Sequence, residues 1–471
     1  MGRNSQQRRA NRKRLASQKQ RSAHSAYSAP TAPTAQQPSH TWTSPSRAVI
    51  ETAIHSAARS AFGPGEHKAA FLDSARMLTA LEDDPHNQVR PSPIINEQLV
   101  AALTRLYENG WQPSDVAHAV KREWNLRAGR LAVGVIAAQA RSSAAAERAP
   151  HEWLAQLDEI GVFDATRGVI RGGYDNTFAA WSKAERLHSD DAITTGLQVL
   201  GQLLMSPRQP VLMALPSTWG ATNRGTMPQL STRVVDGAVD AKALKLIRAL
   251  LSKAEGTTFE AEAEAFTAKA QEMMTRYSID AAVLASSGEH AAGGKTSGVQ
   301  SRRVHIDSPY ADEKAGFLAV LAQVNGARSI WSPQVGSATV MGFPVDLQLT
   351  DLLFTSLLFQ ATKASGEATA HDRRLRTPSF RRAFLVAFAD RIGERLESTK
   401  VRASKAAEQD YGTSLVPILA DRDEAVAQVY EQTFPNATLM PSRRLNAYGW
   451  HAGRAAADLA KFGTGAALAE G

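Results

Sequence analysis

The residues of this sequence best suited to chemistry are arginines that cluster in one short segment. HDRRLRTPSFRR brings together five of them: Arg373, Arg374, Arg376, Arg381 and Arg382. The segment leads into a helix that we expect after Ser379, and guanidinium groups at a helix N-terminus, where backbone N–H groups also point outward, suit phosphate binding. The alternative is an exposed loop in which these arginines pair with Asp372 and Asp390. Downstream, SRRLNAYGWHAGR adds a further basic group beside Trp450 and His451: Arg443, Arg444 and Arg454.

A second concentration of positive charge lies in residues 1–47. This segment has no Asp or Glu and holds nine basic residues: Arg3, Arg8, Arg9, Arg12, Lys13, Arg14, Lys19, Arg21 and Arg47. The whole chain has 54 basic and 46 acidic residues, so the part after residue 47 is nearly neutral. The segment is rich in Ser, Gln, Ala and Pro and poor in aliphatic residues, which predicts disorder. A nucleic-acid anchor, a solubilising tail and a transit peptide are all compatible with it.

A third group of polar residues lies in HIDSPYADE. His305 and Asp307 share one face of an extended segment, and Asp312 follows closely. These residues could form a divalent-metal or acid–base site. The alternative, which we favour, is a helix cap at Ser308 or Asp312 beside a solvated strand.

Many other chemistries are excluded by what the sequence lacks. It has no Cys, so disulfides, thiolate zinc sites, iron–sulfur clusters and thiol nucleophiles are absent. No two of its twelve His residues lie within four positions of each other, which removes helix-borne zinc motifs. There is no Walker A loop, no G-x-G-x-x-G and no G-x-S-x-G. The sequence therefore predicts no cofactor and no assigned catalytic or metal-binding residue.

The elements that would position these residues are mostly helices. Residues 48–205 show helical periodicity, most clearly around GWQPSDVAHAV, where we expect Ser114 to cap a short helix between Asn109-Gly110 and a third helix starting near Leu126. We also expect Asn96 to cap the helix before it. This arrangement is compatible with a helix-turn-helix reader or with plain helix packing, and we favour packing.

A helical hairpin is predicted within residues 239–285. Ile247, Phe266, Ala270, Met273 and Tyr277 belong to the apolar stripes of its two helices, which Gly256 separates. Its signature resembles a small bacterial and phage domain of unknown function, whose A-x-x-A-Q-E-L-M-x-x-Y consensus is similar to residues 265–277. SPYADEKAGFL, SATVMGF and SFRRAFLVAFADRI resemble the domain that often accompanies it, and GWQPSDVAHAV resembles a segment upstream. The resemblance implies this architecture and no established activity.

The remaining residues predict an α+β domain. A helix from Ala311, a hairpin formed by ARSIWS and SATVMGF, a long helix after Pro344 and a further helix after Ser379 predict a small sheet covered on one face by helices. The fold class is thus mainly α with an α+β C-terminal domain. The expected organisation is a tail (1–47), a helical domain (48–205), a linker (206–238), the hairpin (239–285), a linker (286–302), the α+β domain (303–461) and a tail (462–471).

The function that these features favour is a non-enzymatic, nucleic-acid-associated or adaptor role in the cytoplasm. Its partners would be DNA or RNA, bound without sequence preference through the basic tail and the arginine cluster, or a protein. A metal-dependent enzyme built on the C-terminal domain and a structural protein–protein interaction module are the alternatives. No membrane association is expected, because the most apolar runs are too short or too interrupted to cross a bilayer.

Overall fold

The structure of the chain is a computed structural model. It describes residues 45–63, 65–173, 175–220, 298–370, 372–411, 415–438 and 445–460, together with 245–247, 249–250, 253, 269–270 and 272–282 of the hairpin segment. Residues 45–471 fall within one compact unit. Among the described residues, no helix combines the length and the apolar character needed to cross a membrane.

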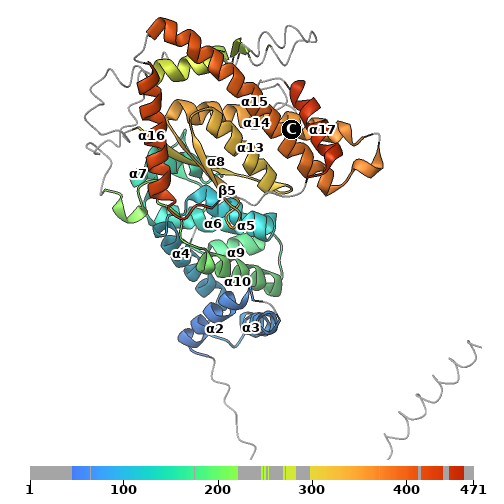
Figure 1. The fold of residues 1–471 in the computed structure, drawn as a ribbon. Helices are drawn as coiled ribbons and strands as arrows, with labels where there is room; N and C mark the ends of the chain where they lie inside the picture. The colour runs from blue at the N-terminus through green and yellow to red at the C-terminus, as the bar shows by residue number, and fades with distance from the viewer. Residues whose placement is uncertain are drawn as a thin grey trace, which may run out of the picture. The chain divides into compact units, whose positions relative to one another are not determined.

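The first region is a helical assembly around one core. Its helices are α2 (Arg47–Ser60), α3 (Glu66–Asp83), α4 (Pro91–Glu108), α5 (Pro113–Glu123), α6 (Leu126–Ser142), α7 (Ala145–Arg148), α8 (His151–Glu159), α9 (Thr177–Ala184) and α10 (Ser189–Met205) (Figure 1). Two short strands, β1 (Phe163–Asp164) and β2 (Val169–Ile170), pair antiparallel. Residues spaced three or four positions apart form the buried stripes, such as Ile50, Ile54 and Ala57 on α2, because that spacing returns to one helix face.

The segment after α10 packs against this core. It contains a short 3-10 helix, η1 (Pro216–Thr218), followed by the buried Trp219. The Trp219 ring meets the ring of Trp153 edge to face at 5.2 Å. Residues 206–220 of the expected linker are therefore part of the helical region, and residues 221–238 lie outside the described residues.

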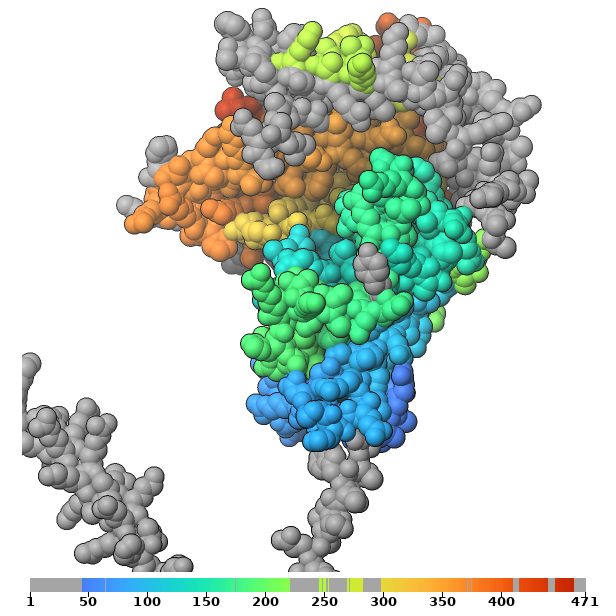
Figure 2. All heavy atoms as spheres, turned by 180° about the vertical axis from the view of Figure 1, so that it is seen from behind, coloured from blue at the N-terminus to red at the C-terminus, as the bar shows by residue number. Residues whose placement is uncertain are grey.

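The second region combines a three-stranded antiparallel sheet with helices. Its elements are β3 (Gln300–His305), α13 (Ala311–Val324), β4 (Arg328–Ser332), β5 (Ser337–Gly342), α14 (Pro344–Ala368), the 3-10 turn η3 (Arg373–Leu375), α15 (Pro378–Tyr411), α16 (Leu415–Thr433) and α17 (Ala447–Asp458). The strand order is β3-β5-β4. Figure 2 shows the described atoms of this region in yellow to red and those of the helical region in blue to green.

The sheet is covered more fully than expected. Every residue of the central strand β5 is buried, so both faces of that strand are covered, and the prediction of one covered face was wrong. On one face Ala338 and Val340 join the apolar core of α13, α14 and α15. The other face carries Arg303 and His305 of β3, because side chains alternate along a strand and these two pair with Thr339 and Ser337 of β5.

The hairpin segment shares the core of the second region. Ile247, Ala270, Met274 and Tyr277 are buried in the same apolar cluster as Phe317. This burial agrees with the predicted inward positions of Ile247, Ala270 and Tyr277, whereas Phe266 lies outside the described residues.

The fold class, mainly α with an α+β C-terminal region, is confirmed, but three predicted helix caps are wrong. Tyr310, and neither Ser308 nor Asp312, precedes α13. Asn96 lies inside α4 because that helix already begins at Pro91. Its Oδ1 accepts a hydrogen bond from the Phe178 backbone N–H instead. Gln112, and not Ser114, precedes α5 and forms a capping box with Asp115. Strand β3 also begins at Gln300, inside the expected linker.

Candidate functional site

Asp115 organises a polar network where α5 meets β3. It lies in the first turn of α5, where one carboxylate oxygen accepts a hydrogen bond from the Gln112 backbone N–H at 3.0 Å. A carboxylate is favourable at this position because the N-terminus of a helix is positive. The side chain is fully buried. A buried carboxylate needs further partners, and β3 supplies them.

Arg303 is the cation that neutralises Asp115. Its Nη1 pairs with Asp115 Oδ2 and also donates to the Gly110 carbonyl at 3.0 Å, and its Nη2 donates to the Pro210 carbonyl at 2.8 Å. Its side chain is only 2% exposed. Burial alone would raise the pKa of Asp115, but the hydrogen bond from His305 and the charge of Arg303 outweigh it, so this pKa lies below its usual value.

Two histidines complete the network. His305 Nε2 donates to Asp115 Oδ1 at 2.9 Å, and the His305 ring stacks on His118 of α5 with centroids 4.8 Å apart. His118 Nδ1 lies 3.7 Å from a carboxylate oxygen of the exposed Asp307. Burial, followed by the neighbouring His305, lowers the pKa of His118 to about 4. We call these five residues (Asp115, His118, Arg303, His305 and Asp307) the clasp.

The clasp differs from the site expected around His305. Asp312 is not part of it, because Asp312 accepts a hydrogen bond from the Trp331 indole at 3.0 Å. In the part of the chain that the structure describes, no group of three or more His, Asp or Glu residues is arranged to hold a metal ion. His305, Asp307 and Asp312, which the sequence offered as an alternative metal site, are therefore not grouped as metal ligands in that part of the chain. The stacked rings leave no room for a reacting group between them, so the geometry favours a tether between α5 and the sheet.

His118 gives the clasp a measurable dependence on pH. Its folded pKa of about 4 lies below the ordinary histidine pKa of 6.5. The unfolded chain therefore takes up a proton as the pH falls from about 6.5 to about 4, while the folded protein does not. The part of the free energy of unfolding that depends on His118 is therefore fully present above this window and decreases as the pH falls through it. Between pH 7.5 and pH 4.5, the free energy of unfolding of a His118→Gln variant should fall by about 2 kcal/mol less than that of the wild type, as measured by urea unfolding. An identical pH dependence in the two proteins would contradict this assignment.

The arginine cluster of HDRRLRTPSFRR is divided between structural and open positions. Arg376 donates to the carbonyls of Thr369 and Ala370 at 3.0 and 2.8 Å, so it satisfies backbone groups at the end of α14. Arg382 lies 3.6 Å from Glu313. Neither guanidinium is fully available to a ligand.

Arg373 and Arg381 occupy the open positions. Within the described ranges, no hydrogen bond or ion pair involves their guanidinium groups, and the first turn of α15 contains no acidic residue. By contrast Arg454, which the sequence suggested as an addition, is paired with Asp390 and Glu394 at 3.0 and 2.9 Å. The side chain of Arg374 and the whole of Arg8, Arg9, Arg12, Lys13, Arg14, Arg443 and Arg444 lie outside the described residues.

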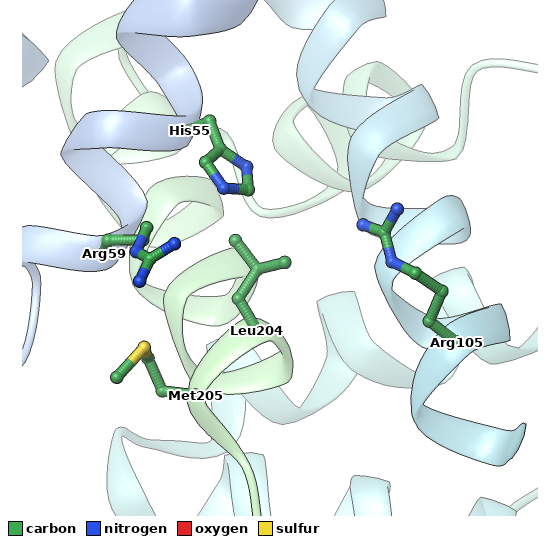
Figure 3. Close-up of a pocket in the computed structure, with 5 residues that line it drawn as sticks. All are labelled: His55, Arg59, Arg105, Leu204 and Met205. Carbon is green, nitrogen blue, oxygen red and sulfur yellow. The ribbon is translucent and has the colours of Figure 1, made fainter. Parts of the chain in front are cut away.

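A shallow depression in the helical region was not expected from the sequence. It measures about 270 Å³ and lies between α2, α4 and α10 (Figure 3). Its lining residues are His55, Arg59, Arg105, Leu204 and Met205. The two arginines stand 46 positions apart in the sequence, so no local spacing signals their approach.

Fold and contacts together define a mainly helical protein with a small antiparallel sheet. A family model described as "Protein of unknown function (DUF2786)" matches residues 242–281. The match covers the helical-hairpin segment, and the resemblance of the following region to a companion domain stays a prediction. The search of the curated proteins and that of the solved structures found no significant match to the chain.

Proposed function

We propose that this protein binds nucleic acid without sequence preference, through phosphate contacts of the basic N-terminal segment and of the arginines at the start of α15. The observation that carries the proposal is the open pair Arg373 and Arg381. Other arginines near them pair with carboxylates, such as Arg391, which donates to Asp458 and Glu394, or donate to helix-terminal carbonyls, such as Arg376. Two unpaired guanidiniums beside an acid-free helix N-terminus create a positive field that a phosphate group would neutralise.

The distribution of charge supports the same proposal. Nine of the 54 basic residues lie within residues 1–47, which hold no acidic residue, and the rest of the chain is close to neutral. Phosphate contacts release counterions from nucleic acid, so a segment of this kind provides affinity without reading bases. The first described helix, α2, begins at Arg47, the last basic residue of this segment.

Removing residues 1–46 should flatten the salt dependence of binding. If three to six basic groups of the tail meet phosphates, log K against log salt for duplex DNA should have a slope of roughly −3 to −5 from the tail alone. The measurement is fluorescence anisotropy between about 50 and about 200 mM salt. The truncated chain should keep its helical circular dichroism, since Arg47 begins α2. An intact chain that binds no DNA even near 50 mM salt would end the proposal.

The contribution of the open pair is separable from the overall charge of the protein. Arg373→Gln with Arg381→Gln should weaken binding by roughly tenfold at about 100 mM salt, since two phosphate contacts would be lost. The matched control is Arg402→Gln with Lys405→Gln, which removes the same charge from α15 at positions roughly 30 Å beyond Arg381. An equal loss in both variants would mean that net charge, and not this pair, determines the affinity.

A further inference from the structure

The depression on the helical region combines two open guanidiniums with an apolar floor. In Figure 3 Arg59 of α2 and Arg105 of α4 extend from opposite sides toward Leu204 of α10, and Met205 lies below Arg59. In the described part of the chain, no carboxylate or carbonyl pairs with either guanidinium. Arg47, at the other end of α2, is by contrast held by Glu51 at 2.7 Å and by Glu97.

The apolar floor is as informative as the charge. Met205 is 54% exposed although Leu203, two positions earlier, belongs to the core. An exposed methionine is a flexible, polarizable surface, and its thioether makes favourable contacts with aromatic rings. A purely ionic ligand would leave this floor unused, so the depression fits a ligand with an anionic group joined to a flat ring.

We infer that the depression binds single-stranded nucleic acid, with phosphates at Arg59 and Arg105 and an unstacked base on Leu204 and Met205. The inference rests on the proposed nucleic-acid binding and specifies which form of nucleic acid this site accepts. A volume of about 270 Å³ has room for a group the size of one base. A duplex keeps its bases stacked inside, so it meets the two arginines but not the apolar floor, whereas single strands present free bases to such surfaces.

Residues on either side of the depression could contact further nucleotides of a bound single strand. His55 lines this depression and also an adjoining one along α2, together with Glu51, Thr52, Ser56 and Arg59, and the Glu51 carboxylate is paired with Arg47. On the other side the Gln209 backbone N–H donates to the Asn109 carbonyl at the end of α4, which brings the exposed Arg208 near the helix end that carries Arg105. Apart from this paired carboxylate, the groups that continue from the floor are hydroxyls along α2 and the basic Arg208 beyond α4. The basic N-terminal segment leads into α2 at Arg47, which is twelve residues before Arg59. At the rise of an α-helix this corresponds to roughly 18 Å.

The test compares strand types and uses the full chain. Binding of oligothymidylate of about 20 nucleotides and of a duplex of equal length is measured by anisotropy for the wild type and for Arg59→Gln with Arg105→Gln. Single-strand binding should weaken by roughly tenfold and its salt slope should fall by about 1.4, while duplex binding should change by less than about threefold. The matched control is Arg76→Gln with Arg167→Gln, two exposed arginines elsewhere on the helical region, which should leave both affinities nearly unchanged.

The floor is tested separately from the charge. Met205→Glu should weaken single-strand binding by a similar factor, and Met205→Leu should retain it, because leucine keeps the apolar surface. Equal losses on single strand and duplex in the arginine variant, or no loss on the single strand, would overturn the inference and leave the proposed function standing. A wild-type protein that binds neither nucleic acid would overturn both.

Discussion

Replacing Asp115 by alanine is expected to cost about 3–5 kcal/mol of the free energy of unfolding. The substitution leaves the Arg303 guanidinium, whose side chain is 2% exposed, as a buried charge without its carboxylate. It also removes the acceptor for His305 Nε2 and for the Gln112 backbone N–H. Because removing one member of a buried ion pair leaves the other uncompensated, the loss exceeds the net value of the pair. Urea denaturation at pH 7 measures it.

Two further variants test whether the buried charge is the cause. Asp307→Ala removes an aspartate of the same clasp whose side chain is 72% exposed, and it should change stability by less than about 0.5 kcal/mol. Asp115→Leu with Arg303→Met should recover a large part of the loss, since both charges are then gone. If Asp115→Ala and Asp307→Ala have equal effects, Asp115 is not the organising residue of the clasp.

Replacing Gly453 by alanine is expected to destabilise the protein by about 2–3 kcal/mol, against the intrinsic helix preference. Gly449 and Gly453 lie on the face of α17 that contacts α15. A Cβ atom at Gly453 would lie 2.3 Å from the carbonyl oxygen of Phe384, and one at Gly449 would lie 2.4 Å from that of Phe380. These neighbours are backbone atoms of α15, so relief requires the two helices to separate.

The control for this prediction is the same substitution where space is available. At Gly316 in α13 and Gly366 in α14, an added Cβ atom would have no neighbour within 4 Å. Alanine there should stabilise the protein by about 0.5–1 kcal/mol, because glycine is the poorer helix former. Thermal unfolding should thus show opposite signs for Gly453→Ala and Gly316→Ala. A stabilised Gly453→Ala protein would show that α17 does not pack this closely on α15.

The sequence by itself determined the elements and the class of fold. Helical stripes such as Ile50 and Ile54 are local patterns, because one turn of helix brings residues four apart onto one face. The hairpin of ARSIWS and SATVMGF was predicted correctly as β4 and β5, since alternation and the short turn between the strands are also local signals. The basic composition of residues 1–47 is likewise a property of the sequence alone.

Only the tertiary structure decided which polar residues are available to a ligand. Arg373 and Arg376 look alike in the sequence, yet Arg376 donates to the carbonyls at the end of α14, whereas the Arg373 guanidinium has no partner among the described residues. The sequence left open whether His305 belongs to a metal site or to a solvated strand, and the structure shows its Nε2 hydrogen-bonded to Asp115, 190 positions earlier. The depression at Arg59 and Arg105 arises where α2, α4 and α10 converge. Periodicity reports which face of an element is buried, whereas the partner of a charge depends on which distant element packs against that face.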